Sequence, residues 1–89
     1  MSLLIGYDLN RPGQNYKSLH DAIKALGSAH WHILDSTWIV DTQKTCTQAR
    51  DELKKHIDSN DKLLVVQLTG VGAWTGFTQT GTDWLKSRL

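Results

Sequence analysis

Asp8 is the residue of this chain best placed for chemistry, because it lies near the end of a short apolar segment, Leu3 to Leu9, that has the pattern of a β-strand. A carboxylate at the end of a central strand is costly unless it is hydrated or paired. One carboxylate can help to hold Mg²⁺, which binds through one or two carboxylates together with waters and phosphates. In a symmetric dimer, two copies of Asp8 could supply that pair. The alternative is that Asp8 accepts N–H groups of the turn that follows it.

The polar loop after this strand is a candidate phosphate site. It runs Asn10-Arg11-Pro12-Gly13-Gln14-Asn15-Tyr16 and leads into an expected helix, whose first N–H groups could hold a phosphate together with Arg11 and Lys17. The loop matches neither the Walker nor the dinucleotide fingerprint, and an ordinary strand-to-helix turn is the alternative. The ligand-binding candidates here are Asn10, Arg11, Gln14, Tyr16 and Lys17.

Histidine and tryptophan side chains supply weaker signals. His30 and His32 have the i, i+2 spacing of a strand face that can chelate a metal, but no third histidine or cysteine lies nearby, so a zinc site is not expected. His20 lies on an expected helix and should be solvated. Trp74 follows the last strand in an irregular segment, where it could stack on a base, cover an open sheet face or contact a partner subunit.

Length and composition indicate one domain over residues 1–89, with a core over 3–68 and an extension over 69–89. Ten Lys and Arg against nine Asp and Glu leave a net charge of +1, so a nucleic-acid partner would require a local basic patch or a dimer. Cys46 is the only cysteine, which excludes an internal disulfide and favours a cytoplasmic location. No apolar run approaches the ~18 residues of a membrane span, so no membrane partner is expected.

Local patterns predict the element order β-α-β-β-α-β, which is the α+β, ferredoxin-like arrangement. Thr45 and Gln48 have capping-box spacing, and Gly27 suits a helix stop. The expected fold is a four-stranded antiparallel sheet in the order 4-1-3-2, with both helices on one face and a homodimer formed through the open face. The expected strands are 3–9, 29–34, 37–42 and 62–68, the helices are 16–26 and 45–57, and a short terminal helix covers 82–88.

Side-chain alternation predicts which residues reach the open face. If Asp35-Ser36 is a two-residue turn, residue 30 pairs with 41 and the hairpin divides into two faces. The face expected under the helices holds Trp31, Ile33, Trp38 and Val40, together with Leu3, Ile5, Tyr7 and Leu9 of the first strand. The face expected to be open holds His30, His32, Leu34, Thr37, Ile39 and Asp41, together with Leu4, Gly6 and Asp8.

These segments resemble the Cas-two superfamily, which contains the small CRISPR-adaptation protein and the VapD-type toxin ribonucleases. The closer likeness is to small bacterial and phage proteins labelled SinR-like, and it spans residues 3–77. No helix-turn-helix pattern accompanies that label. The similar segments are Gly6-Tyr7-Asp8-Leu9-Asn10 with Pro12-Gly13-Gln14, Ser36-Thr37-Trp38, Leu68-Thr69-Gly70 and Ala73-Trp74-Thr75-Gly76-Phe77.

The resemblance implies a homodimer in which Asp8 is the metal-binding catalytic aspartate and Ser36 is the strand-entry serine of the same site. For the members that are metal-dependent nucleases, it implies Mg²⁺ as cofactor and RNA or DNA as substrate. Other members are non-catalytic scaffolds. This chain departs from the nuclease pattern, because the loop after Asp8 is not arginine-rich and the net charge is nearly zero.

Three functions therefore remain open. The first is a metal-dependent nuclease that acts on phosphodiesters through Asp8 and Ser36. The second is a non-catalytic module that binds a nucleotide, a nucleic acid or a protein, for example a phage counter-defence protein that sequesters a signal or blocks a host factor. A structural scaffold that uses its sheet edge as an adaptor is a further alternative.

Overall fold

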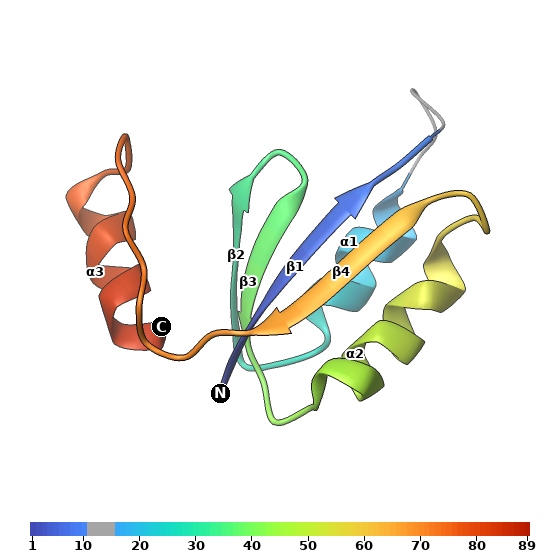
Figure 1. The fold of residues 1–89 in the computed structure, drawn as a ribbon, viewed down its shortest axis with the longest axis horizontal. Helices are drawn as coiled ribbons and strands as arrows, with labels where there is room; N and C mark the ends of the chain where they lie inside the picture. Colours follow the sequence, from blue (N-terminus) through green and yellow to red (C-terminus); the bar gives the residue numbers. More distant parts are fainter. Residues whose placement is uncertain (11–15) are drawn as a thin grey trace.

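The four strands and their connecting helices follow one another along the chain in the order that the sequence patterns predict. The computed structural model describes residues 1–10 and 16–89. Figure 1 shows the elements in chain order: β1 (Ser2–Asp8), α1 (Lys17–Lys24), β2 (Ala29–Leu34), β3 (Thr37–Asp41), α2 (Cys46–Leu53), the 3-10 turn η1 (Lys54–His56), β4 (Lys62–Gln67) and α3 (Gln79–Arg88).

The strands form one antiparallel sheet in the order β2-β3-β1-β4, so β1 and β3 are the central strands. Read from the opposite edge, this is the order 4-1-3-2. The protein is therefore α+β, and its arrangement is compatible with a ferredoxin-like fold. None of the described helices has the length and apolar character needed to cross a bilayer.

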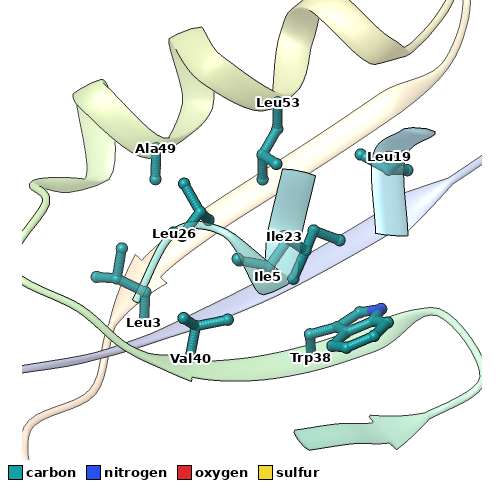
Figure 2. Packing of buried hydrophobic residues seen from close by; sticks show 9 residues of the cluster. All are labelled: Leu3, Ile5, Leu19, Ile23, Leu26, Trp38, Val40, Ala49 and Leu53. Carbon is teal, nitrogen blue, oxygen red and sulfur yellow. The ribbon is translucent and has the colours of Figure 1, made fainter. Parts of the chain in front are cut away.

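One face of the sheet packs against α1 and α2 and forms the core (Figure 2). Period-two alternation in β1 points Leu3 and Ile5 into this layer, and both are fully buried. The sequence predicts these positions correctly, together with Trp38 and Val40 of β3. The nine buried residues of the core are Leu3, Ile5, Leu19, Ile23, Leu26, Trp38, Val40, Ala49 and Leu53.

The start of α2 is set by local chemistry. The Thr45 side chain accepts a hydrogen bond from the Gln48 backbone N–H at 3.1 Å, and the Gln48 side chain accepts one from the Thr45 N–H at 2.9 Å. This reciprocal pair is the capping box that the spacing predicts, and it satisfies two N–H groups that a helix terminus leaves without partners.

The predicted facing of β2 is wrong, because the hairpin contains a register shift. Leu34 pairs with Thr37 as expected, but Trp31 pairs with Ile39 and His30 pairs with Val40. Two residues of β2, His32 and Ile33, therefore lie opposite Trp38 alone, which is the geometry of a β-bulge.

Beyond this bulge, every side chain of β2 changes face. Trp31 and Ile33 lie on the face away from α1 and α2, and His30 and His32 lie beside Trp38 on the helix-covered face. The sequence predicted the reverse for all four residues.

The C-terminal segment crosses to the second face of the sheet, where α3 packs on the opposite side from α1 and α2 (Figure 1). Trp31 makes edge-on contacts with Phe77 and Trp84, at ring-centroid distances of 5.3 and 5.7 Å. A Cβ on Gly81 would lie 2.6 Å from the Trp31 ring, so glycine lets α3 approach the sheet closely. The extension thus covers β2 and β3 of its own sheet and buries Ile39.

Candidate functional site at the end of β1

Asp8 is the last residue of β1 and is exposed at the end of a central strand, as the sequence predicts. Its cross-strand partner in β4 is Lys62, and the next pair on the same face of the sheet joins Gly6 to Leu64. These residues line a shallow hollow of about 220 Å³. A carboxylate in this position is accessible to solvent and to a ligand.

Ser36 lies beside the end of the same strand. The Tyr7 backbone N–H donates a hydrogen bond to the Ser36 carbonyl oxygen at 3.1 Å, which extends the β1–β3 ladder by one residue toward Asp8. The turn between β2 and β3 therefore brings Ser36 next to the residue that precedes Asp8. Sequence reasoning placed Ser36 at this end of the sheet, and the structure agrees.

Asn10 is held by the loop that precedes β4. Its backbone N–H donates to Asp61 Oδ1 at 2.8 Å, and its side-chain amide donates to the Asn60 carbonyl oxygen. The second oxygen of the Asp61 carboxylate accepts the Asp58 N–H at 2.8 Å. Asp61 thus ties the chain after β1 to the turn before β4, a contact that no local sequence pattern indicates.

Of the other four phosphate-loop candidates, two lie within the described residues and two lie outside them. Arg11 and Gln14 lie outside the described residues. The Lys17 amine pairs with the Asp21 carboxylate at 2.6 Å, one helical turn along α1. Tyr16 is half-buried and packs against the core beneath the helices.

Trp74 does not join Asp8. Its indole N–H donates to the Thr82 hydroxyl at 3.2 Å, and its ring lines a hollow together with Leu4 and Leu85 on the face away from α1 and α2. Leu4 is four residues before Asp8 on β1. Trp74 therefore covers the sheet of its own chain, which is one of the three roles that the sequence left open.

The carboxylates and imidazoles of the described residues do not assemble a metal centre. Across residues 1–10 and 16–89, no three His, Cys, Asp or Glu side chains gather closely enough to hold a metal ion. Asp8 is a single exposed carboxylate, and its donor chemistry suits Mg²⁺, which keeps several waters and accepts one or two protein carboxylates.

Sequence reasoning missed a cluster of aromatic and imidazole rings on the helix-covered face. The Trp38 indole N–H donates to the Tyr7 hydroxyl oxygen at 3.2 Å, and that hydroxyl lies 3.3 Å from His20 Nε2. The His32 ring stacks on Trp38 with centroids 4.2 Å apart. His20 is half-buried in this cluster, so the expectation of a solvated side chain is wrong. Strand alternation places Tyr7 and Trp38 together on the helix-covered face, and the β2 bulge adds His32 by turning its ring toward Trp38.

We expect the free energy of unfolding to fall as the pH drops below 6.5, because of His20. Partial burial lowers the pKa of His20 below its ordinary value of 6.5, His32 and Lys24 lower it further, and Asp21 opposes them. Below pH 6.5 the unfolded chain binds a proton on His20 that the folded chain resists, so this contribution to stability is present above pH 6.5 and is lost below it. Urea unfolding between about pH 7.5 and 5.5 measures the effect, because this pH range brackets the ordinary histidine pKa. The slope should flatten in His20→Gln and persist in His56→Gln; equal slopes in both variants would contradict the assignment to His20.

Comparison with known proteins identifies no family for this chain. No protein-family model matches it, and no solved structure shows a significant match.

Proposed function

We propose that this protein is a homodimeric, metal-dependent nuclease in which Asp8 holds a divalent cation. The observation that carries the proposal is the exposed Asp8 carboxylate at the end of a central strand. The Cas-two-like segments around these two residues point the same way. When bound, Mg²⁺ would supply an activated water for attack on a phosphodiester.

The residues of the chain have separate roles in this proposal. Asp8 supplies the negative charge that retains the cation. The exposed Ser36 hydroxyl is a hydrogen-bond donor for a non-bridging phosphate oxygen. Lys62, the cross-strand partner of Asp8, adds a positive charge that attracts the phosphate backbone. Hydrolysis forms a bond from the water oxygen to phosphorus and breaks the bond to the leaving oxygen, which takes up a proton.

The proposed dimer would use the part of the second sheet face that α3 leaves uncovered. Leu64 is 58% exposed and Val66 is 38% exposed, and both lie on β4 opposite residues of β1 that point away from the core. A Cβ on Gly6 would meet nothing within 4 Å, so the sheet is bare beside them. Burying these side chains against a second copy is favourable by about 25 cal/mol per Å² of apolar surface. The strip ends at Asp8, which favours a dimer that brings two Asp8 carboxylates together.

The test is cleavage of labelled RNA and DNA with Mg²⁺ or Mn²⁺, with the oligomeric state recorded on the same samples. We expect cleavage by wild type and a loss of at least about 100-fold in Asp8→Asn, because the cation loses its charged ligand; a factor of 100 is about 2.7 kcal/mol of transition-state stabilisation. Asp83→Asn removes an exposed carboxylate from α3 and should leave the rate unchanged. Leu64→Lys should give a folded monomer with little activity.

A well-folded dimer that cleaves neither nucleic acid would overturn the nuclease proposal. Nucleotide or nucleic-acid binding that survives Asp8→Asn would then favour the non-catalytic binding module. A wild-type monomer that cleaves would leave Asp8 in place but would remove the dimer from the mechanism.

A further inference from the structure

We infer that the outer edge of β4 binds an extended, acidic peptide segment of another protein, which adds a fifth strand to the sheet. Among the described strands β4 pairs only with β1, so it lies at one edge of the sheet, and α2 runs beside it (Figure 1). Peptides bind to sheet edges in this way through backbone hydrogen bonds and alternate side chains. The inference does not rest on the proposed nuclease activity, because Asp8 and Ser36 take no part in it.

The register between β1 and β4 shows which backbone groups of β4 are already bonded. The Leu68 N–H donates to the Ser2 carbonyl oxygen at 2.9 Å, so these two residues form a hydrogen-bonded pair. In an antiparallel ladder such pairs recur at every second residue, which makes Leu64 and Val66 hydrogen-bonded partners of β1. The residues between them turn their N–H and C=O groups away from the sheet.

Three residues therefore form the outer edge of β4: Leu63, Val65 and Gln67. No hydrogen bond joins their outward N–H and C=O groups to another residue within 1–10 and 16–89. Donors and acceptors alternate along this edge, and an added β-strand matches them over the whole length of β4. A helix or a compact ligand would satisfy only part of the edge.

β4 also lacks the features that protect sheet edges from pairing. It contains no proline and no register shift, and its only charged residue is Lys62 at its first position. The opposite edge strand, β2, contains the bulge at His32 and Ile33, and a bulge bends and twists a strand so that it pairs poorly. Of the two edges, that of β4 is therefore the one open to a further strand.

A hollow between α2 and β4 provides side-chain specificity. This hollow has a volume of about 240 Å³, and its α2 wall includes Cys46 and Thr47. Leu63 and Val65 line its other wall, and the residues of an added antiparallel strand that lie directly opposite them point to the same face. Apolar side chains at alternate positions of the peptide would therefore enter this hollow.

Charge at one end of the edge favours acidic residues in the peptide. A cavity of about 520 Å³ adjoins the hollow, and Arg50 and Lys54 line it together with Leu63 near the start of β4. Arg50 is paired with the Asp51 carboxylate at 2.9 Å, whereas Lys54 forms no ion pair with any described residue. In an antiparallel arrangement the C-terminal part of the peptide lies at this end. A carboxylate that follows the apolar residues would therefore meet Lys54.

A second copy of this chain fits the edge less well. Two β4 strands that pair about a two-fold axis place both α2 helices on the same side of the joined sheet. The residues of α2 and η1 that line the hollow and the cavity are Cys46, Thr47, Arg50 and Lys54, and none of them is acidic. Each copy would present Lys54 to a wall without acidic residues, whereas an acidic peptide neutralises this charge.

The test is a titration of the protein with the peptide acetyl-Thr-Val-Thr-Val-Thr-Val-Glu-Glu-amide, followed by backbone NMR. We expect saturable binding and slower hydrogen exchange of the Leu63 and Val65 amides, which gain acceptors from the peptide. The Leu64 and Val66 amides are bonded to β1 with or without the peptide, so they are internal controls. Binding without new protection at Leu63 and Val65 would overturn strand addition.

N-methylated peptides separate the two sides of the added strand. A methyl group on the nitrogen of the central valine removes an N–H that faces β4 and blocks its approach, so it should weaken binding at least about tenfold. The same methyl group on the threonine before it points away from β4 and should change the affinity less than about twofold. Equal losses for the two peptides would contradict pairing through the outer edge of β4.

Lys54→Gln and Lys55→Gln test the acidic end of the peptide. Lys55 is adjacent to Lys54, but its amine lies 3.4 Å from the Glu52 carboxylate, and it lines neither the hollow nor the cavity. We expect Lys54→Gln to weaken binding about tenfold and Lys55→Gln less than about twofold. Both lysines are exposed, so the variants should fold, which circular dichroism checks. Equal losses would indicate nonspecific attraction and would overturn the proposed recognition of charge.

Protein concentration distinguishes the peptide from a second copy. If the Leu63 and Val65 amides gain protection as the protein alone is concentrated, the edge pairs with another copy and the proposal of a partner peptide is overturned. The absence of binding at millimolar peptide would overturn the site itself. Asp8→Asn should leave peptide binding unchanged, so failure here is distinguishable from failure of the nuclease proposal.

Discussion

Gly27→Ala should destabilise the protein by at least about 3 kcal/mol, which is beyond the usual cost of an added methyl group. A Cβ at position 27 would lie 1.9 Å from the Asp41 carbonyl oxygen, 2.8 Å from its carbon and 2.9 Å from the Thr42 Cα. All three atoms belong to backbone, so no side-chain rotation relieves the overlap. The connection between α1 and β2 would have to move away from the end of β3, and the 3.0 Å hydrogen bond from the Ser28 N–H to the Asp41 carbonyl would be lost.

Thermal and urea unfolding measure this effect, with Gly6→Ala as the control. A Cβ on Gly6 meets nothing within 4 Å, so that substitution adds the same methyl group to open space and should change stability by less than about 1 kcal/mol. For a domain of this size, each kcal/mol shifts the melting temperature by about 4–8 °C. Gly27→Ala should therefore melt more than about 12 °C below wild type. Similar melting temperatures for the two variants would show that the α1–β2 connection packs differently.

The second large effect concerns Leu53, which points from α2 into the core (Figure 2). Its side chain is fully buried, and Leu53→Ala should cost about 2–5 kcal/mol through lost burial and the cavity left behind. The neighbouring aliphatic side chains come from both helices and from the central strands, so no single element can move to fill the space.

Leu34→Ala makes the same change on a side chain that is 55% exposed, and it should cost less than about 1 kcal/mol. Urea unfolding curves of the two variants give the comparison, with the denaturant slope confirming that both unfold in the same manner. If Leu34→Ala lowered the free energy of unfolding as much as Leu53→Ala does, β2 would have to be buried against a second chain as well as its own.

The features that the sequence predicted correctly depend on neighbours along the chain. The Thr45–Gln48 capping box involves residues three apart, and the burial of Leu3 and Ile5 follows from the alternation of one strand. Asp8 was expected at the exposed end of a central strand because the apolar segment before it is unambiguous. Gly27 was chosen as a helix stop, but it lies outside the left-handed region; of the described glycines only Gly70 and Gly76 have positive φ. Glycine is needed at this position instead because the Asp41 backbone lies too close to leave room for a Cβ.

The facing of β2 could not be predicted, because it depends on one extra residue in the pairing with β3. A shift by one position exchanges the two faces of a strand, and nothing in the local pattern marks His32 and Ile33 as a bulge. The stacking of His32 on Trp38 follows from that shift and was missed for the same reason. The cavity beside Arg50 was missed because one wall belongs to α2 and η1 and the other belongs to the loop before β4.

The sequence by itself therefore determined the α+β class, the order of the elements, the core of the central strands and the position of Asp8. Only the tertiary structure decided which face β2 presents, how α3 covers the second face, and which charged side chains share a cavity. Short-range periodicity and capping act over a few residues of one chain segment, so they can be recognised from the order of residue types. Register between strands and contacts between helix and loop depend on the balance of packing across the whole fold, which no single segment contains.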